Sequence, residues 1–185
     1  MRIGYYQYHP EFGAPKRNLE KVEDALARID ADIIVLPELA FTGYFFEDRE
    51  ELHDLAEDVS ESPTVHRLSR LCKNNAFHLV VGFAERCKGR LYNTALVIGP
   101  SGLLHRYRKL HLFNTEKENR PRGELLFTGQ SQIVGPKGEV IASSNSDEEA
   151  IVICDIDLSC ARNKFITDNN NLFADRRPEF YASIV

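Results

Sequence analysis

The sequence lacks the features that mark a membrane protein, a secreted protein or a protein stabilised by a bound metal. Its apolar runs all fall well short of the roughly 20 residues that a membrane span needs. No apolar signal-peptide core follows Met1, because Gln7, His9 and Glu11 interrupt the first segment. The four cysteines contain no C-x-x-C pair, which argues against a zinc site and against a disulfide framework. We therefore expect a cytoplasmic protein in a reducing compartment, with no metal.

The sequence also lacks an excess of positive charge. Its net charge is -5 and its pI is near 5.7. This balance gives no electrostatic basis for binding nucleic acid or an anionic membrane. Hydrophobic residues make up 43% and charged residues 28%, and no low-complexity linker divides the chain. We therefore expect residues 1–185 to form one soluble globular domain.

The pattern of apolar residues predicts an α/β layer fold. An aromatic-rich strand over residues 2–8 precedes a helix from Pro15 to Asp30, and a short all-apolar strand follows over residues 32–37. Strand, helix and strand in this order favour a right-handed crossover. A further helix is predicted from Pro63. The strands predicted after it cover residues 78–86, 91–98, 103–113, 130–134, 139–144 and 148–158.

Two hairpins and the C-terminal tail complete the organisation. The turns GPSG (99–102) and GPKG (135–138) join similar strand pairs, a similarity that is typical of a quasi-symmetric architecture. The last 25 residues are polar with interspersed aromatic side chains. We expect this tail to pack on another surface.

Glu38 is the first candidate site residue. It follows Ile33–Leu36, a buried-type strand, and Pro37. Open α/β sheets place ligands at the carboxyl ends of their strands, so a carboxylate there is a candidate general base. The alternative is an ordinary carboxylate of a surface loop.

Lys109 is the second candidate, in the segment HRYRKLHLF. Strand alternation puts it on one face with His105, Tyr107 and His111. A lysine in such surroundings can stabilise a developing oxyanion. The alternative is a solvated edge strand whose basic residues discourage aggregation.

Four segments together resemble the nitrilase superfamily of carbon-nitrogen hydrolases. They are LPELAFTGY with Glu38, NTALVIGPSGLLHRYRKLHLF with Lys109, FTGQSQIVGPKGEVIAS, and DRRPEFY. The resemblance spans almost the whole chain. It implies an α-β-β-α sandwich, usually dimerised through a helical face, with the two hairpins in the two different sheets.

The resemblance also implies a chemistry without cofactor or metal. In that family a cysteine thiolate attacks the carbon of a small amide, carbamoyl group or nitrile, and a thioester or thioimidate forms. The resemblance assigns the general acid-base role to Glu38 and oxyanion stabilisation to Lys109. It gives Glu116 a supporting role that positions the other two.

The sequence departs from the family at the nucleophile. The family cysteine lies 30 to 40 residues beyond the lysine and before the second hairpin, where this chain has none. Cys154 follows that hairpin in a different strand pattern, and Cys160 lies later still, so we reject both. Cys72 and Cys87 precede the lysine. The simplest account is an internal deletion of on the order of 80 residues, about a third of a normal domain, which joins the chain near residues 125–128 and leaves the sandwich incomplete.

Three hypotheses about function follow. The first is a truncated carbon-nitrogen hydrolase with negligible activity, because it cannot form the thioester. The second is a non-catalytic subunit that forms a homo-oligomer or associates with a full-length paralogue. The third is a degenerate product without a function.

Overall fold

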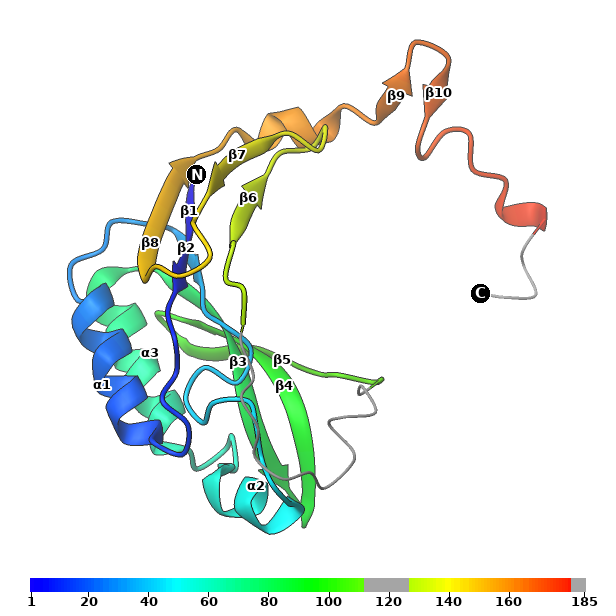
Figure 1. Cartoon of the computed structure of the whole chain (residues 1–185). Helices are drawn as coiled ribbons and strands as arrows, with labels where there is room; N and C mark the ends of the chain where they lie inside the picture. The colour runs from blue at the N-terminus through cyan, green and yellow to red at the C-terminus, as the bar shows by residue number, and fades with distance from the viewer. Residues whose placement is uncertain (112–126, 181–185) are drawn as a thin grey trace.

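The structure, a computed structural model, describes residues 1–111 and 127–180 and has a mixed six-stranded sheet at its centre (Figure 1). The strand order is β5-β4-β3-β2-β1-β8. The strands β1, β2 and β3 run parallel, and the other neighbours pair antiparallel. The strands are β1 (Arg2–Gln7), β2 (Ile33–Val35), β3 (His78–Cys87), β4 (Arg90–Gly99), β5 (Gly102–Arg108) and β8 (Ala150–Asp155).

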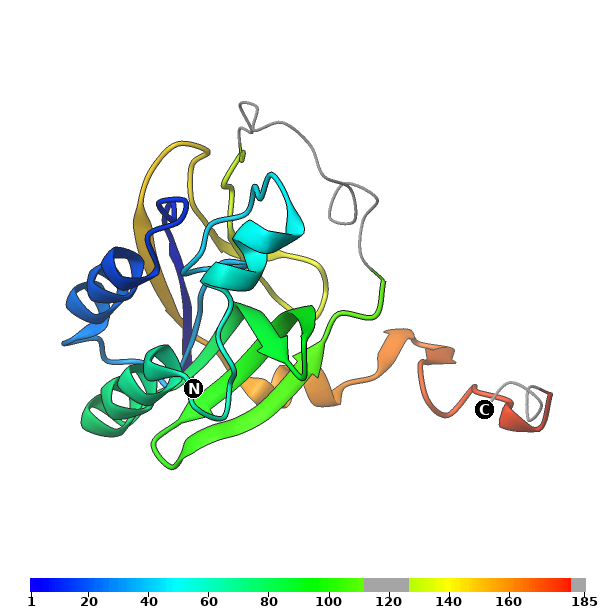
Figure 2. The same cartoon turned by 90° about the horizontal axis from the view of Figure 1, so that it is seen from below.

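Two helices, α1 (Pro15–Leu26) and α3 (Pro63–Asn75), cover one face of this sheet (Figures 1 and 2). Both begin with proline, whose fixed φ suits the first turn of a helix. The core between helices and sheet contains fully buried Val22, Leu68 and Leu79. This layer is the hydrophobic core that holds the domain together.

The predicted strand–helix–strand unit is confirmed, but its elements are shorter than predicted: the second strand covers Ile33–Val35 rather than residues 32–37. The helix ends at Leu26 rather than at Asp30. The chain must re-enter the sheet at that point: the backbone N–H of Asp32 donates to the carbonyl of Arg2 at 2.8 Å, and the Asp32 carboxylate accepts from the Arg2 N–H at 2.6 Å. These bonds to β1 stop the helix before its last predicted turn.

The other face of the sheet carries the second hairpin. Strands β6 (Gln132–Val134) and β7 (Val140–Ser143) form a separate two-stranded sheet, whereas the GPSG hairpin joins β4 to β5 in the central sheet. The hydroxyl groups of Tyr5 and Ser144 lie 2.8 Å apart and tie the hairpin to β1. Apolar side chains remain exposed on this side, including Val35 and Val134.

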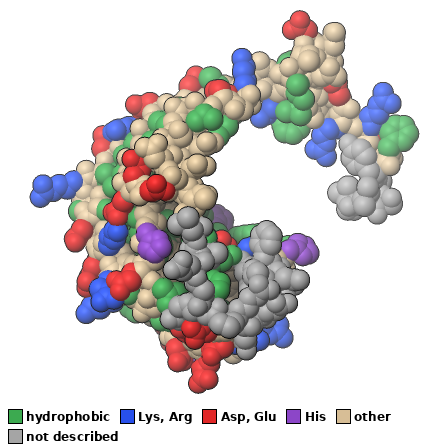
Figure 3. All heavy atoms as spheres, viewed as in Figure 1, with side chains coloured by type: hydrophobic (Ala, Val, Ile, Leu, Met, Phe, Trp, Pro, Cys, Tyr) green, Lys and Arg blue, Asp and Glu red, His purple; other side chains and the backbone are tan. Residues whose placement is uncertain are grey.

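An arm extends from the end of β8 away from the body (Figures 1 and 2). It comprises η2 (Leu158–Arg162), β9 (Phe165–Thr167), β10 (Asn170–Asn171) and η3 (Pro178–Phe180). Its turns are held by bonds within the arm, such as the Leu172 N–H to the Lys164 carbonyl at 2.8 Å. Arm and body enclose a wide hollow (Figure 3). The expected packing of the tail on another surface therefore stays a prediction.

The remaining helix, α2 (Arg49–Leu55), begins where the Asp48 carboxylate accepts from the Glu51 N–H at 2.8 Å. In the part of the chain that the structure describes, no helix combines the length and the apolar character needed to cross a membrane.

Candidate functional site

The segment after β2 stays bonded to β3 and carries Glu38 to the end of the sheet. The Leu36 N–H donates to the carbonyl of Val80 at 2.8 Å, and the Ala40 N–H donates to the carbonyl of Gly82 at 3.0 Å. Any side chain at position 82 would clash with the backbone of Glu38, because an added Cβ would lie 2.4 Å from the Glu38 Cα. Glycine at position 82 therefore lets the loop approach the sheet closely.

The loop is held in a strained conformation next to Glu38. Leu39 is buried and has a φ of +48°, a value that non-glycine residues rarely adopt. The Tyr8 hydroxyl donates to the Ala40 carbonyl at 2.6 Å, and the Asn18 amide donates to the Phe41 carbonyl at 2.6 Å. Such strain persists only where the surroundings fix the backbone, and it is frequent at functional sites.

The Glu38 carboxylate binds two side chains from the neighbouring strands. The Asn93 Nδ2 donates to Glu38 Oε1 at 2.6 Å, and the Lys109 Nζ lies 3.4 Å from the same oxygen. The Lys109 N–H in turn donates to the Asn93 carbonyl at 2.9 Å. The structure thus brings together a carboxylate that can accept a proton and an ammonium that can stabilise an oxyanion.

Glu116 lies outside the described residues, so its place stays a prediction. Asn93 was not predicted as a site residue, although a polar residue within the apolar strand LYNTALVI is a signal that could have indicated it. The Glu38 side chain is 45% exposed and that of Lys109 28%. Solvent therefore reaches the pair.

The four cysteines of the chain all lie among the described residues and occupy other places. Cys154 lies in β8 and pairs with Ile3 of β1. Because β1 separates β8 from β2, Cys154 is two strands from β2, or roughly 10 Å across the sheet. Ile3 pairs with Ile33, five residues before Glu38, which is on the order of 15 Å along the chain. Cys154 therefore lies toward the opposite end of the sheet from Glu38.

The other thiols are no better placed. Cys72 is a fully buried residue of α3, and its Sγ lies 3.6 Å from the Ile98 carbonyl; burial raises the pKa of this thiol to about 12. Cys87 ends β3, five residues beyond Gly82. Cys160 is exposed in η2 and lies against Asp157. None of these positions brings a thiolate to the Glu38 carboxylate.

A pocket of about 940 Å³ opens beside Glu38, between the uncovered face of the sheet and residues 127–134. Its outer wall is fixed by Gln7, whose Nε2 donates to the carbonyls of Asn145 and Glu148, at 2.9 Å each. The Gln7 Oε1 accepts from the Ser131 N–H at 2.8 Å. These three hydrogen bonds of Gln7 hold the segments that form this wall next to β1.

The lining of this pocket is mostly apolar. Among the described residues that line it, Glu38 is the only Asp, Glu, Lys or Arg. Aromatic side chains supply much of the rest, and the Tyr44 and Phe127 rings meet edge to face with centroids 5.2 Å apart. The aromatic residues in the lining are Tyr5, Tyr6, Tyr8, Phe12, Tyr44, Phe45 and Phe127. A smaller pocket of about 270 Å³ lies on the other side of Glu38, against Asn93 and Lys109.

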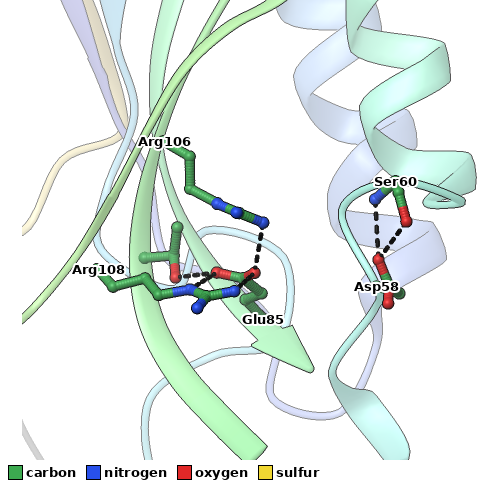
Figure 4. A network of polar contacts seen from close by, with 6 residues as sticks. Asp58, Ser60, Glu85, Arg106 and Arg108 are labelled. Atoms are coloured by element: carbon green, nitrogen blue, oxygen red, sulfur yellow. Dashed lines mark hydrogen bonds and ion pairs between the residues drawn. The ribbon is translucent and has the colours of Figure 1, made fainter. Parts of the chain in front are cut away.

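A second carboxylate, Glu85, forms a buried ion cluster on the helix-covered face (Figure 4). Arg108 donates twice, from Nη2 to Oε1 at 2.6 Å and from Nε to Oε2 at 3.0 Å. Arg106 adds a bond of 2.9 Å to Oε1, and the Thr94 hydroxyl adds one of 2.7 Å to Oε2. The Glu85 side chain is 1% exposed.

The arginines keep Glu85 charged. Burial by itself would raise the pKa of this carboxyl, but the hydrogen bonds from Arg108 and Thr94 and the charge of Arg106 outweigh burial and hold the pKa below its ordinary value. No role was predicted for Glu85, although alternation with buried Leu79, Val81 and Phe83 puts it on the covered face. In the described sheet β5 is an edge strand, which agrees with the edge position that the sequence offered as the alternative for the segment HRYRKLHLF.

Comparison with known proteins identifies relatives over the whole chain. A nitrilase of Pyrococcus abyssi is 29% identical over 260 residues, which take in 98% of this chain and 99% of the nitrilase. Since this chain has 185 residues, at least 75 of those 260 positions have no residue here. The protein N-terminal amidase of Saccharomyces cerevisiae is 32% identical over 69% of this chain, but the match covers only 31% of that amidase.

Solved structures share the fold. The NitN amidase from Neterenkonia sp. AN1 matches with a TM-score of 0.74 at 16% identity, over 100% of both chains. A CN-hydrolase superfamily protein from Xanthomonas campestris matches with a TM-score of 0.56 at 25% identity, over 67% of this chain and 47% of its own. The mixed α/β architecture with a central sheet is thus that of the nitrilase fold. The family model for carbon-nitrogen hydrolases matches residues 2–126, and the chain therefore belongs to the carbon-nitrogen hydrolase family.

Proposed function

We propose that this chain retains the acid-base and oxyanion groups of a carbon-nitrogen hydrolase but does not complete the covalent step by itself. The observation that carries the proposal is the Glu38 carboxylate, with Asn93 and Lys109 on one of its oxygens and no thiol of this chain near it. Glu38 would exchange the protons of the reaction, and Lys109 would stabilise the oxyanion. The family attack on carbon requires a thiolate that none of the four cysteines supplies there.

An internal deletion is the proposed cause. Two findings support it: the family match ends at residue 126, beside the proposed junction at 125–128, and the alignment to the Pyrococcus nitrilase leaves at least 75 positions without a counterpart. Part of the junction falls outside the described residues. The deleted segment would carry the nucleophile strand and would leave the sandwich incomplete on the side where the apolar sheet face is uncovered.

The proposed substrate class is an uncharged amide, carbamoyl compound or nitrile. Relatives are named as nitrilase, 2-oxoglutaramate amidase and (R)-stereoselective amidase, so the family context includes both bond types. The apolar pocket beside Glu38 supports a ligand with an apolar or aromatic group.

Ammonia release from a panel of amides and nitriles tests the proposal. We expect no release above buffer, whereas median enzymes turn over about 10 times per second. Turnover on that scale would overturn it. Variants Cys154→Ala and Glu38→Gln would then identify the nucleophile and the base.

The intact mass of the protein from its natural source tests the deletion. A mass near 21.1 kDa supports a shortened chain. A mass greater by about 9 kDa, the weight of ~80 residues of a typical domain, would mean that the nucleophile segment is present in the cell.

A second candidate function is a non-catalytic assembly subunit. It is favoured by the arm, whose Phe165, Ile166, Phe173 and Phe180 are all more than half exposed, and by the uncovered apolar face of the sheet. Exposed apolar side chains become interaction sites where they gather into a patch. The partner would be a second copy or a full-length paralogue.

Light scattering and co-purification with a full-length family member test this candidate. We expect association that is weakened by the double change Phe165→Ser and Phe173→Ser, but not by Arg90→Ser at the exposed start of β4. A monomer of 21.1 kDa that does not bind the paralogue would contradict this candidate function.

A further inference from the structure

We propose that Glu85 is a positioning residue for the candidate site: by binding Arg108 it fixes the end of β5 so that Lys109 faces Glu38. The two carboxylates lie on opposite faces of the same strands. Glu85 binds Thr94 of β4 and Arg108 of β5, and Glu38 binds the adjacent residues Asn93 and Lys109.

Strand alternation explains this arrangement. Thr94 and Arg108 pair across β4 and β5, so their side chains point to the same face. Asn93 and Lys109 come one residue earlier and one residue later, and they point to the opposite face. A one-residue slip of β5 would exchange the faces, because the side-chain period of a strand is two. The bonds at Glu85 therefore determine which side chain of β5 reaches Glu38.

The end of β5 needs such a restraint. Within residues 1–111 and 127–180 it is an edge strand that pairs with β4 alone, and this pairing is already irregular between Val97 and Ile98. Lys109 lies just beyond the last paired residue, Arg108. Arg108 is anchored by two hydrogen bonds to Glu85, and its guanidinium lies 3.8 Å from the centre of the Tyr92 ring. This bidentate geometry fixes orientation as well as position.

The consequence for catalysis rests on the proposed function of Glu38 and Lys109. The effect of Glu85 on the position of Lys109 does not depend on that function. The proposal concerns the position of the Lys109 ammonium. It can therefore be tested without any hydrolysis, and it can fail while the proposed function stands.

The experiment measures how fast each lysine of the intact protein is acylated by an amine-reactive ester, by mass spectrometry at a temperature well below melting. Lys21, Lys73 and Lys137 serve as internal standards. In Glu85→Gln and Arg108→Gln we expect several-fold faster labelling of Lys109 and no change at the three standards, because a Lys109 side chain that no longer lies against Glu38 is more accessible to the reagent than the 28% exposed side chain of the wild type.

Arg106→Gln is the matched control. Arg106 also binds Glu85, but its loss leaves both hydrogen bonds of Arg108 in place. A merely structural role predicts that the three variants lower the melting temperature and leave the relative labelling of Lys109 unchanged; that result would overturn the proposal. Equal acceleration in Arg106→Gln and Arg108→Gln would overturn it as well.

Should Glu85→Gln fail to fold, Arg108→Lys keeps the charge and removes the bidentate geometry. Accelerated labelling of Lys109 in that variant supports the positioning role, and unchanged labelling refutes it. Circular dichroism of each variant confirms that folded protein is compared.

Discussion

The Tyr8 hydroxyl donates to the Ala40 carbonyl at 2.6 Å and so ties the first strand to the loop that carries Glu38. Both residues are buried, and Ala40 directly follows the strained residue Leu39. The same loop is pressed against Gly82 of β3. The candidate site therefore depends on the core beneath it, and substitutions in that core should alter the position of Glu38.

Tyr8→Phe should destabilise the protein and loosen this loop. The change leaves the Ala40 carbonyl buried without its partner, at a cost of about 1–2 kcal/mol. Urea unfolding measures the loss, and amide exchange of residues 39–42 should quicken. The exposed Tyr107→Phe serves as control and should change stability by less than about 0.5 kcal/mol. Equal effects of the two changes would show that the hydrogen bond of Tyr8 does not stabilise the loop.

Gly82→Ala should displace Glu38. The added methyl would lie 2.4 Å from the Glu38 Cα, so backbone must shift, at a cost of about 1–3 kcal/mol. Gly138→Ala is the control: its φ of +84° strains alanine by about 1–2 kcal/mol, but its methyl meets open space. We expect faster labelling of Lys109 in Gly82→Ala alone. Unchanged labelling there would show that the loop tolerates the methyl group.

Glu85→Gln should remove a pH-dependent part of the stability. The folded-state pKa of Glu85 is lowered, so its contribution is present above the ordinary value of 4.5 and is lost as the pH falls below it. At pH 7 we expect wild type to exceed the variant by about 2–3 kcal/mol, toward the low end for a broken buried pair because both arginines reach solvent.

Urea titrations of both proteins from pH 7 to pH 3 measure this difference. It should stay constant down to about pH 4.5 and then shrink. A difference that is unchanged at pH 3 would mean that other carboxylates account for the acid sensitivity.

The pocket beside Glu38 should prefer uncharged ligands. A ligand carboxylate near Glu38 is repelled by about 1–4 kcal/mol at 4 Å, depending on the local dielectric. In ligand-observed NMR we expect phenylacetamide and phenylacetonitrile to bind at least about tenfold more tightly than phenylacetate, or 1.4 kcal/mol. Tyr44→Ala should weaken this binding, whereas Phe165→Ala on the arm should not. Preference for phenylacetate would contradict the prediction.

Much of the fold was readable from local patterns. The helix that begins at Pro15 and the strands around it follow from periodicity, because each element has one face to bury. The end of that helix was predicted too late, since the bonds between Asp32 and Arg2 that stop it join residues distant in sequence. Glu38 and Lys109 were named from motifs, and their catalytic roles remain predictions.

The sequence by itself determined the family, the order of the elements and the inventory of thiols, because these depend only on residue types and their spacing. The tertiary structure alone decided which side chains come into contact. It placed Asn93 and Lys109 on one oxygen of Glu38, put Cys154 toward the far end of the sheet, and buried Glu85 under two arginines. Those relationships arise from strand pairing and register, which bring together residues tens of positions apart and which no local pattern specifies.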